Sequence, residues 1–214
     1  MPFERMVPTP RGEARVVARR AKRPLATLVL THGAGGGIDA PDLQRLAVSL
    51  PTQDISVTLV EMPWRVQGKK IAPGAAAIDE CYRAVLDRMR MRSALVLGGR
   101  SAGARSAARI ARSVGASGLL ALSFPLHPPG KPERSRAEEL SHARVRTLVV
   151  QGERDPFGTP EEFPDSTAVV AVPDADHSLK VPRVAALSQA DALAMVLEAT
   201  LEWVVRDVVG NPIG

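Results

Sequence analysis

A serine at a predicted strand-to-helix corner is the residue of this sequence best placed for covalent chemistry. Ser101 lies within Gly99–Gly103, after the apolar residues 94–97 and before an alanine-rich stretch. Such a turn lifts the hydroxyl above the sheet edge, and the flanking glycines leave room for the neighbouring strand and helix. The N-terminus of the helix adds partial positive charge and free N–H groups. The pattern predicts a nucleophile.

A carboxylate and a histidine that could activate this serine follow two later strands. Asp155 comes after the predicted strand 145–152, and His177 comes after the predicted strand 166–173. A histidine can remove the serine proton, and a carboxylate can orient the imidazole. The chain order serine, acid, histidine is the order found in one fold that uses a nucleophile elbow. We therefore expect Ser101, Asp155 and His177 to act together.

Other residues could fill the same roles. Asp174 and Asp176 are alternatives for the acid, although adjacent side chains such as those of Asp176 and His177 rarely face each other well in a loop. His127 follows a predicted strand and is an alternative base, whereas His142 lies in a polar helical stretch and is expected to be solvated.

The glycine-rich loop 31–37, THGAGGG, is the candidate oxyanion site. Backbone N–H groups in such a loop can face a developing negative charge, and we expect the donors to be the amides of Ala34 and Ala102. A phosphate-binding loop of the Walker type would need G-x-x-x-x-G-K-[ST], which is absent. Candidates to line the substrate pocket are His32, Gly33, Gly35, Trp64, Arg65, Arg100 and His127.

Alternating strand and helix patterns surround these residues. Strands are predicted at 14–20, 25–30, 55–63, 93–99, 118–125, 145–152 and 166–173, and helices at 40–51, 74–92, 101–114 and 187–209, with a short helix start at 159–163. This alternation favours an α/β fold with a mostly parallel central sheet flanked by helices. We expect a single domain over 1–214, with 1–13 loosely held.

Only about twenty residues separate the predicted strands 118–125 and 145–152, which is too few for a cap domain. The lid should therefore be minimal and the site open. The segment between these two strands carries the basic residues Lys131, Arg134 and Arg136, which could attract an anionic substrate. A solvated loop explains these residues as well.

Composition narrows the function classes. The net charge is +5, and residues up to Arg23 include seven Lys/Arg and two Glu, yet aromatic residues are only 3% and no nucleic-acid-binding motif follows. The single cysteine, Cys81, allows no internal disulfide and no metal spacing. The start has no secretion signal, and no apolar run approaches the roughly 20 residues of a membrane helix. We expect a cytoplasmic protein that uses no metal or cofactor and binds neither membrane nor nucleic acid.

The motifs THGAGGG, GGRSAGAR, QGERDPFG and DADHSLK resemble the oxyanion loop, nucleophile elbow, acid loop and histidine loop of the α/β-hydrolase superfamily. More narrowly, HGAGGGIDAPDL, EMPWRVQGKK and FPLHPPGKPE resemble a bacterial dienelactone-hydrolase-like branch. That branch is similar to a domain in a subunit of a eukaryotic histone-acetyltransferase complex and to its testis-expressed homologue. Dienelactone hydrolases proper use a cysteine nucleophile, whereas this chain has Ser101. We therefore do not assign the substrate of those enzymes to this chain.

The resemblance and the residues together predict a serine hydrolase that cleaves a small carboxylic ester or thioester without a cofactor. The alternative is a non-catalytic interaction module built on a hydrolase scaffold, as the eukaryotic relatives suggest. Neither the substrate's acyl length nor the oligomeric state follows from the sequence.

Overall fold

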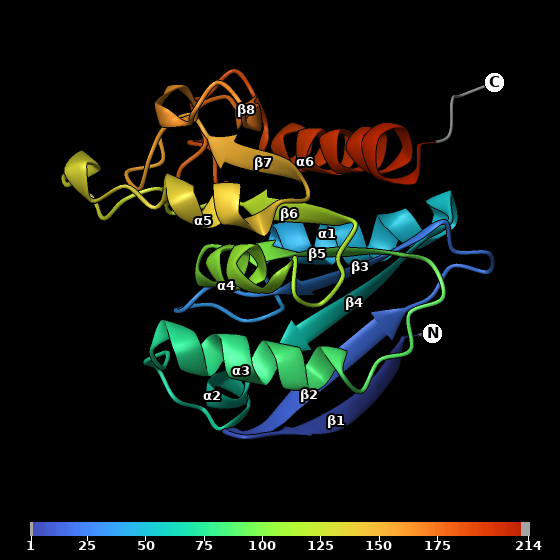
Figure 1. Ribbon diagram of the computed structural model, residues 1–214. Helices are drawn as coiled ribbons and strands as arrows, with labels where there is room; N and C mark the ends of the chain where they lie inside the picture. The colour runs from blue at the N-terminus through green and yellow to red at the C-terminus, as the bar shows by residue number, and fades with distance from the viewer. Residues whose placement is uncertain (1, 211–214) are drawn as a thin grey trace.

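One eight-stranded sheet forms the centre of the protein in a computed structural model that describes residues 2–210. The strands are β1 (Phe3–Thr9), β2 (Gly12–Arg19), β3 (Ala26–Thr31), β4 (Ile55–Glu61), β5 (Ala94–Arg100), β6 (Gly118–Leu122), β7 (Arg146–Gly152) and β8 (Ala168–Val172). Their order across the sheet is β1-β2-β4-β3-β5-β6-β7-β8, and the sheet twists from β1 at the bottom of Figure 1 to β8 at its top.

The pairing is parallel from β4 through β8, whereas β2 pairs antiparallel with both β1 and β4. The predicted mostly parallel sheet is therefore confirmed. Because parallel strands share one direction, their carboxyl ends meet at one edge of the sheet, where ligand-binding loops gather.

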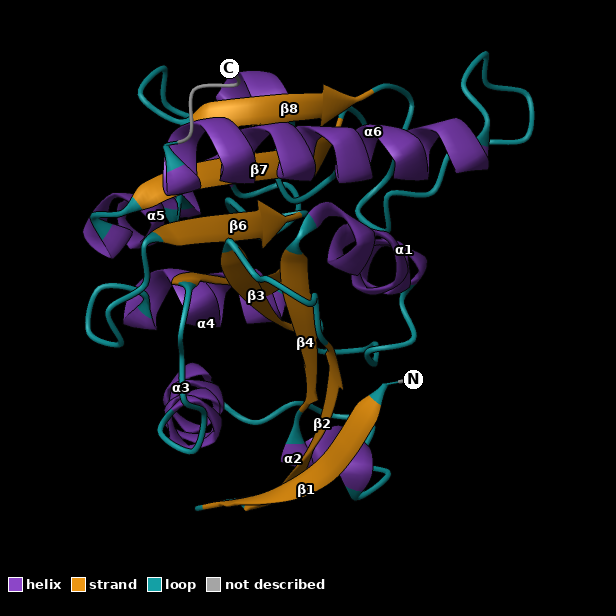
Figure 2. Ribbon diagram, turned by 90° about the vertical axis from the view of Figure 1, so that its right-hand side faces the viewer, coloured by secondary structure: helices purple, strands orange, loops and turns teal. Residues whose placement is uncertain are grey.

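Helices cover both faces of the sheet, as Figure 2 shows. One face carries α1 (Pro41–Ser49) and α6 (Gln189–Trp203), which continues as a π-helical segment, η4 (Val204–Val209). The other carries α3 (Ala75–Leu86), α4 (Ala102–Ile110) and α5 (Ala137–Ala143). Short turns complete the chain: η1 (Leu50–Gln53), α2 (Pro63–Val66), η2 (Pro132–Arg134) and η3 (Pro160–Glu162).

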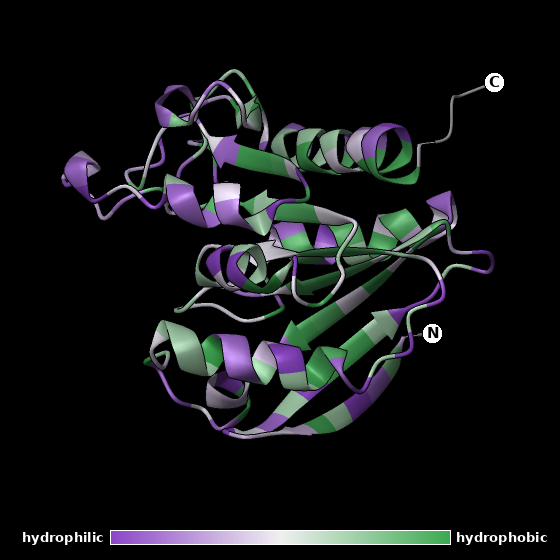
Figure 3. Ribbon diagram, in the orientation of Figure 1, coloured by the Kyte–Doolittle hydropathy of each residue, from purple (hydrophilic) through white to green (hydrophobic). Residues whose placement is uncertain are grey.

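Two apolar layers, one on each face, hold these helices to the sheet. The inner strands are apolar along most of their length, as the green ribbons of Figure 3 show, and every residue of β6 is buried. Each fully buried Leu or Val side chain stabilises the fold by about 1.5–3 kcal/mol. At Gly98 there is no space for a side chain, because a Cβ would lie 2.3 Å from the Leu120 carbonyl oxygen.

The N-terminal segment is more ordered than the sequence indicates. Residues 3–9 form β1, which pairs with β2 after a turn at Pro10 and Arg11, and Gly12 begins β2 with φ of +114°. Val7 is buried in the core with 1% exposure. The expectation that 1–13 are loosely held is wrong for the residues in these strands, because the contacts that fix β1 come from β2 and α3. Met1 lies outside the described residues.

The segment between β6 and β7 contains only η2 and α5. Helix α5 packs against α4, where Glu139 forms an ion pair with Arg105. The segment thus adds no cap domain, and the predicted minimal lid is confirmed. No helix in residues 2–210 is both long and apolar enough to cross a membrane.

Candidate active site

Ser101 occupies a strained corner between β5 and α4. Its φ of 53° and ψ of −115° lie in a region that L-residues rarely adopt. The glycines of the motif have a steric cause: a Cβ at Gly99 would lie 2.6 Å from the Thr31 carbonyl oxygen, and one at Gly103 would lie 2.7 Å from that of His32. The turn is held by a 3.0 Å hydrogen bond from the Ser101 amide to the Leu122 carbonyl.

The structure brings the three predicted catalytic side chains into one hydrogen-bonded row. The Ser101 Oγ lies 3.0 Å from His177 Nε2, and His177 Nδ1 lies 2.7 Å from Asp155 Oδ2. The Asp155 side chain is fully buried, whereas that of His177 is 21% exposed. A buried acid, an oriented imidazole and a reachable hydroxyl are the arrangement that activates a serine.

Two groups fix the carboxylate of Asp155. Gln151 Nε2 donates to Oδ2 at 2.8 Å, and the amide of Phe157 donates to Oδ1 at 2.8 Å. Gln151 Nε2 also donates to the Gly158 carbonyl at 2.7 Å, so it ties the acid to its own loop. These bonds orient the carboxylate toward His177. The sequence indicated neither Gln151 nor Phe157, because a glutamine at a strand end carries no motif.

A buried ion pair holds the loop of His177 from the other side. Arg100 Nη2 donates to the His177 carbonyl at 2.7 Å, and Arg100 Nε lies 3.1 Å from Oδ2 of Asp42 in α1. The Asp42 side chain is only 2% exposed, and burial raises its pKa. The ring of Phe157 packs on the imidazole at a centroid distance of 4.3 Å. Arg100 therefore contacts the backbone of the histidine loop, a role that its place beside the serine did not reveal.

The alternative acids and bases have other partners. Asp176 Oδ1 accepts hydrogen bonds from the amides of Ser178 and Lys180, which closes the loop on itself. His127 Nε2 lies 2.8 Å from Glu162, and its Nδ1 lies 2.9 Å from the Pro128 carbonyl. Hydrogen bonding to that carbonyl and to Glu162 raises the pKa of His127. Neither residue is joined to Ser101.

His32 supports the glycine-rich loop from beneath. Its Nε2 accepts a hydrogen bond from the Met62 amide at 2.9 Å, so the ring proton resides on Nδ1 and is donated to the Gly33 carbonyl at 2.8 Å. Burial lowers the pKa of His32, which favours this neutral form. Trp64 packs edge-on against His32 and is 4% exposed. Both residues position the loop and present almost no surface to a substrate.

Of the two predicted oxyanion donors, Ala102 directly follows the serine, whereas Ala34 lies in the loop whose Gly33 approaches it. Ala102 is the first residue of α4, so its N–H has no partner within the helix. Gly33 approaches the serine closely, since a Cβ there would lie 3.2 Å from the Ser101 Cβ. Ala34 and Gly35 follow at an exposed turn, and Arg65 is half-buried beyond Trp64. Residues 2–210 contain no group of three or more His, Cys, Asp or Glu placed to hold a metal ion.

Comparisons with known proteins agree with this architecture. A serine hydrolase without a lid from Xanthomonas campestris superposes with a TM-score of 0.75 at 17% identity, covering 99% of this chain and 96% of that one. A dienelactone hydrolase from Anabaena variabilis gives 0.73 at 15% identity, with 96% and 97% covered. Est1E from Butyrivibrio proteoclasticus gives 0.70 at 12% identity, with 94% and 99% covered.

These structural similarities concern the fold, and the match in sequence is to a family. The profile of the alpha/beta hydrolase domain family matches residues 24–205, which include the loop 31–37, the elbow at Ser101 and the loops of Asp155 and His177. The predicted superfamily is thus confirmed, and this chain belongs to the alpha/beta hydrolase domain family.

Proposed function

We propose that the protein is a serine hydrolase that cleaves small carboxylic esters or thioesters through an acyl-enzyme on Ser101. The observation that carries the proposal is the continuous contact from Ser101 Oγ through His177 to the buried carboxylate of Asp155. Membership of a hydrolase family supports it, as does the similarity in fold to a serine hydrolase from Xanthomonas campestris.

In the first half of the reaction, Ser101 Oγ attacks the carbonyl carbon of the ester while His177 Nε2 takes the hydroxyl proton. Asp155 stabilises the imidazolium that forms and keeps the ring oriented. The amides of Ala34 and Ala102 bind the oxyanion of the tetrahedral intermediate, each contributing about 3 kcal/mol. The intermediate collapses, His177 gives its proton to the leaving alcohol or thiol, and an ester to Ser101 remains.

In the second half, a water molecule attacks the acyl-enzyme and passes a proton to His177. Collapse of the second intermediate breaks the bond to Ser101 Oγ, which regains the proton, and the carboxylic acid leaves. The partly exposed His177 and the small segment between β6 and β7 leave the acyl group accessible to water. The substrate class follows from the catalytic groups, which act on the carbonyl carbon of an ester or thioester.

Covalent labelling tests the proposal. Wild type, Ser101→Ala and the control Ser141→Ala, which removes an exposed serine on α5, are treated with a fluorophosphonate probe. Hydrolysis of p-nitrophenyl acetate is followed in the same samples. We expect labelling and turnover in wild type and the control, and neither in Ser101→Ala. A folded wild type that is neither labelled nor active would refute the proposal of a serine hydrolase. The non-catalytic interaction module would then be the better explanation.

A further inference from the structure

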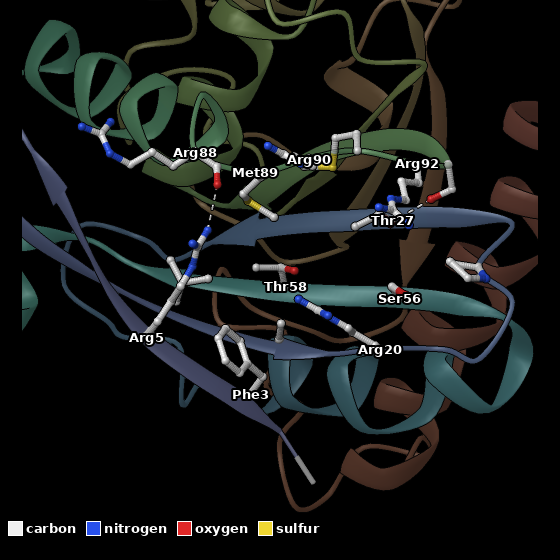
Figure 4. A pocket seen from close by; sticks show the side chains of 15 residues that line it. Phe3, Arg5, Arg20, Thr27, Ser56, Thr58, Arg88, Met89, Arg90 and Arg92 are labelled. Atoms are coloured by element: carbon white, nitrogen blue, oxygen red, sulfur yellow. Dashed lines mark hydrogen bonds between the residues drawn. The ribbon is translucent and has the colours of Figure 1, made fainter.

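A second cavity, of about 620 Å³, lies at the opposite end of the sheet from Ser101. Its floor is formed by β2, β3 and β4, and its sides are β1 and the segment 88–93 that joins α3 to β5 (Figure 4). Ser93 lines the cavity, and the seven residues of β5 separate it from Ser101. At about 3.3 Å per residue the two sites lie about 25 Å apart. The cavity is therefore separate from the candidate active site.

Arginines dominate the polar part of this cavity. No lining residue is acidic, and five are arginines: Arg5, Arg20, Arg88, Arg90 and Arg92. Arg88 faces the cavity with its carbonyl, because its guanidinium donates to the Ala84 carbonyl of α3 at 3.0 Å and points away (Figure 4). Within residues 2–210 none of the five forms an ion pair with a carboxylate. Arg5 instead donates to the Arg88 carbonyl at 3.0 Å, across the cavity. Unpaired guanidinium groups around one space favour a ligand with several negative charges.

The basic N-terminal segment noted in the sequence contributes two of these arginines. Arg5 comes from β1 and Arg20 from the end of β2, while Arg90 and Arg92 come from a segment about seventy residues later. The fold thus gathers charges that are dispersed along the chain. Positive charge concentrated around a cavity indicates an anionic ligand more specifically than the net charge of the molecule does.

The surface of the cavity is mostly apolar, and the hydroxyl groups of Thr27, Ser56 and Thr58 lie on its floor (Figure 4). Val16 and Ala18 of β2 are buried there, and the side chains of Met89 and Met91 lie opposite them. Phe3 is 51% exposed, and the Arg20 guanidinium lies 5.5 Å from its ring centroid. An inorganic anion would leave this surface uncovered, whereas a ligand with an apolar body would cover it.

We propose that this cavity binds a small organic polyphosphate with a planar apolar body, of the class of nucleoside di- and triphosphates. Guanidinium groups match phosphate oxygens with paired hydrogen bonds, and a planar ring system can lie against the apolar surface and Phe3. The cavity volume falls within the range of small-molecule sites. A nucleic-acid strand would need a row of aromatic platforms, and Phe3 is the one aromatic residue among the lining side chains.

Calorimetric titration of the purified full chain with ATP at about 50 mM salt tests the proposal. Arg90→Gln/Arg92→Gln removes two exposed lining charges, and Ala18→Leu narrows the cavity without changing charge. The control Arg45→Gln/Arg112→Gln removes two exposed arginines elsewhere. We expect one ATP per wild-type chain, affinity about tenfold lower or worse in both cavity variants, and no change in the control. Thermal unfolding without ligand verifies that each variant is folded.

Several results would overturn the proposal. Absence of ATP binding would do so, as would an equal loss in the control, which would indicate attraction by net charge alone. If inorganic tripolyphosphate bound as tightly as ATP, the apolar surface of the cavity would contribute nothing to binding. An oligonucleotide that binds more tightly than ATP through the same arginines would assign the cavity to nucleic acid. Ser101→Ala should bind ATP as wild type does, so the outcome is independent of the proposed hydrolysis.

Discussion

The most consequential single residue outside the candidate triad is Arg100. Its side chain is 13% exposed and contacts both the His177 carbonyl and the buried carboxylate of Asp42. The motif G-x-S-x-G leaves the residue before the serine open. The sequence therefore made Arg100 a candidate for lining the pocket and indicated no other role for it. The geometry instead makes it a positioning residue for the histidine loop.

Replacing Arg100 should therefore cost both stability and activity. In Arg100→Gln the Asp42 carboxylate stays buried without its counter-ion, which should destabilise the fold by about 3 kcal/mol. In Asp42→Asn/Arg100→Gln the uncompensated charge is gone, so stability should largely return. The lost hydrogen bond to His177 is not restored, and kcat for ester hydrolysis should remain reduced. Urea unfolding and kinetics measure the two effects; joint recovery of stability and kcat would contradict a positioning role.

The glycine-rich loop offers a steric prediction at two neighbouring positions. In Gly33→Ala the new methyl group would meet Ser101 Cβ at 3.2 Å, so the serine or the loop must shift by a few tenths of an ångström. We expect kcat/KM to fall by about tenfold or more, because catalytic geometry tolerates little displacement. Gly36→Ala is the matched control, since a Cβ there has no neighbour within 4 Å. Equal activity in the two variants would show that this approach is unimportant.

At the scale of elements, the contact between His127 and Glu162 joins the loop after β6 to η3. The pKa of His127 is raised above its ordinary 6.5, and that of Glu162 is lowered below its ordinary 4.5, chiefly by the Thr159 amide. A raised histidine pKa stabilises the fold fully below 6.5, and this contribution is lost as pH rises through the folded-state value. Glutamate's contribution is present above 4.5 and is lost as pH falls. The pair is strongest between these limits.

The pH dependence of unfolding checks this pair. The difference in unfolding free energy between wild type and His127→Gln should be larger at about pH 5.5 than at about pH 8.5. Glu162→Gln should lose less of this pH-dependent unfolding free energy than His127→Gln does. In Glu162→Gln the His127 ring can still donate to the Pro128 carbonyl. A difference that stays constant across this range would mean that the pair does not stabilise the folded state.

The sequence predicts the inner elements well, because a buried parallel strand needs a continuous apolar run. The run 118–122 is fully buried, as its composition indicates. Helix ends were less predictable: α3 ends at Leu86 although the helical pattern continues to residue 92, and that remainder lines the arginine-rich cavity. Strand β1 was missed because an edge strand with one buried face has a weak pattern. Contacts such as Arg100 with Asp42 join distant elements and leave no local signal.

At the scale of the whole molecule, the sheet separates two chemically different ends. The carboxyl ends of the strands gather Ser101, Asp155 and His177, whereas the amino ends of β3 and β4 face a cavity surrounded by arginines. Parallel strands produce this separation, because every crossover helix carries the chain from one end to the other. The two proposed sites share the sheet and no side chain, which makes them separable by mutation.

The open catalytic end leads to a prediction about substrate physical state. Enzymes with a helical lid become faster when their ester forms an interface, because the lid then opens. Here α5 packs against α4 and the His177 side chain is already 21% exposed, so an interface has nothing to uncover. The rate of p-nitrophenyl butyrate hydrolysis should rise smoothly and saturate through the solubility limit. A stepwise increase when the ester separates from solution would mean that the segment between β6 and β7 covers the site and moves.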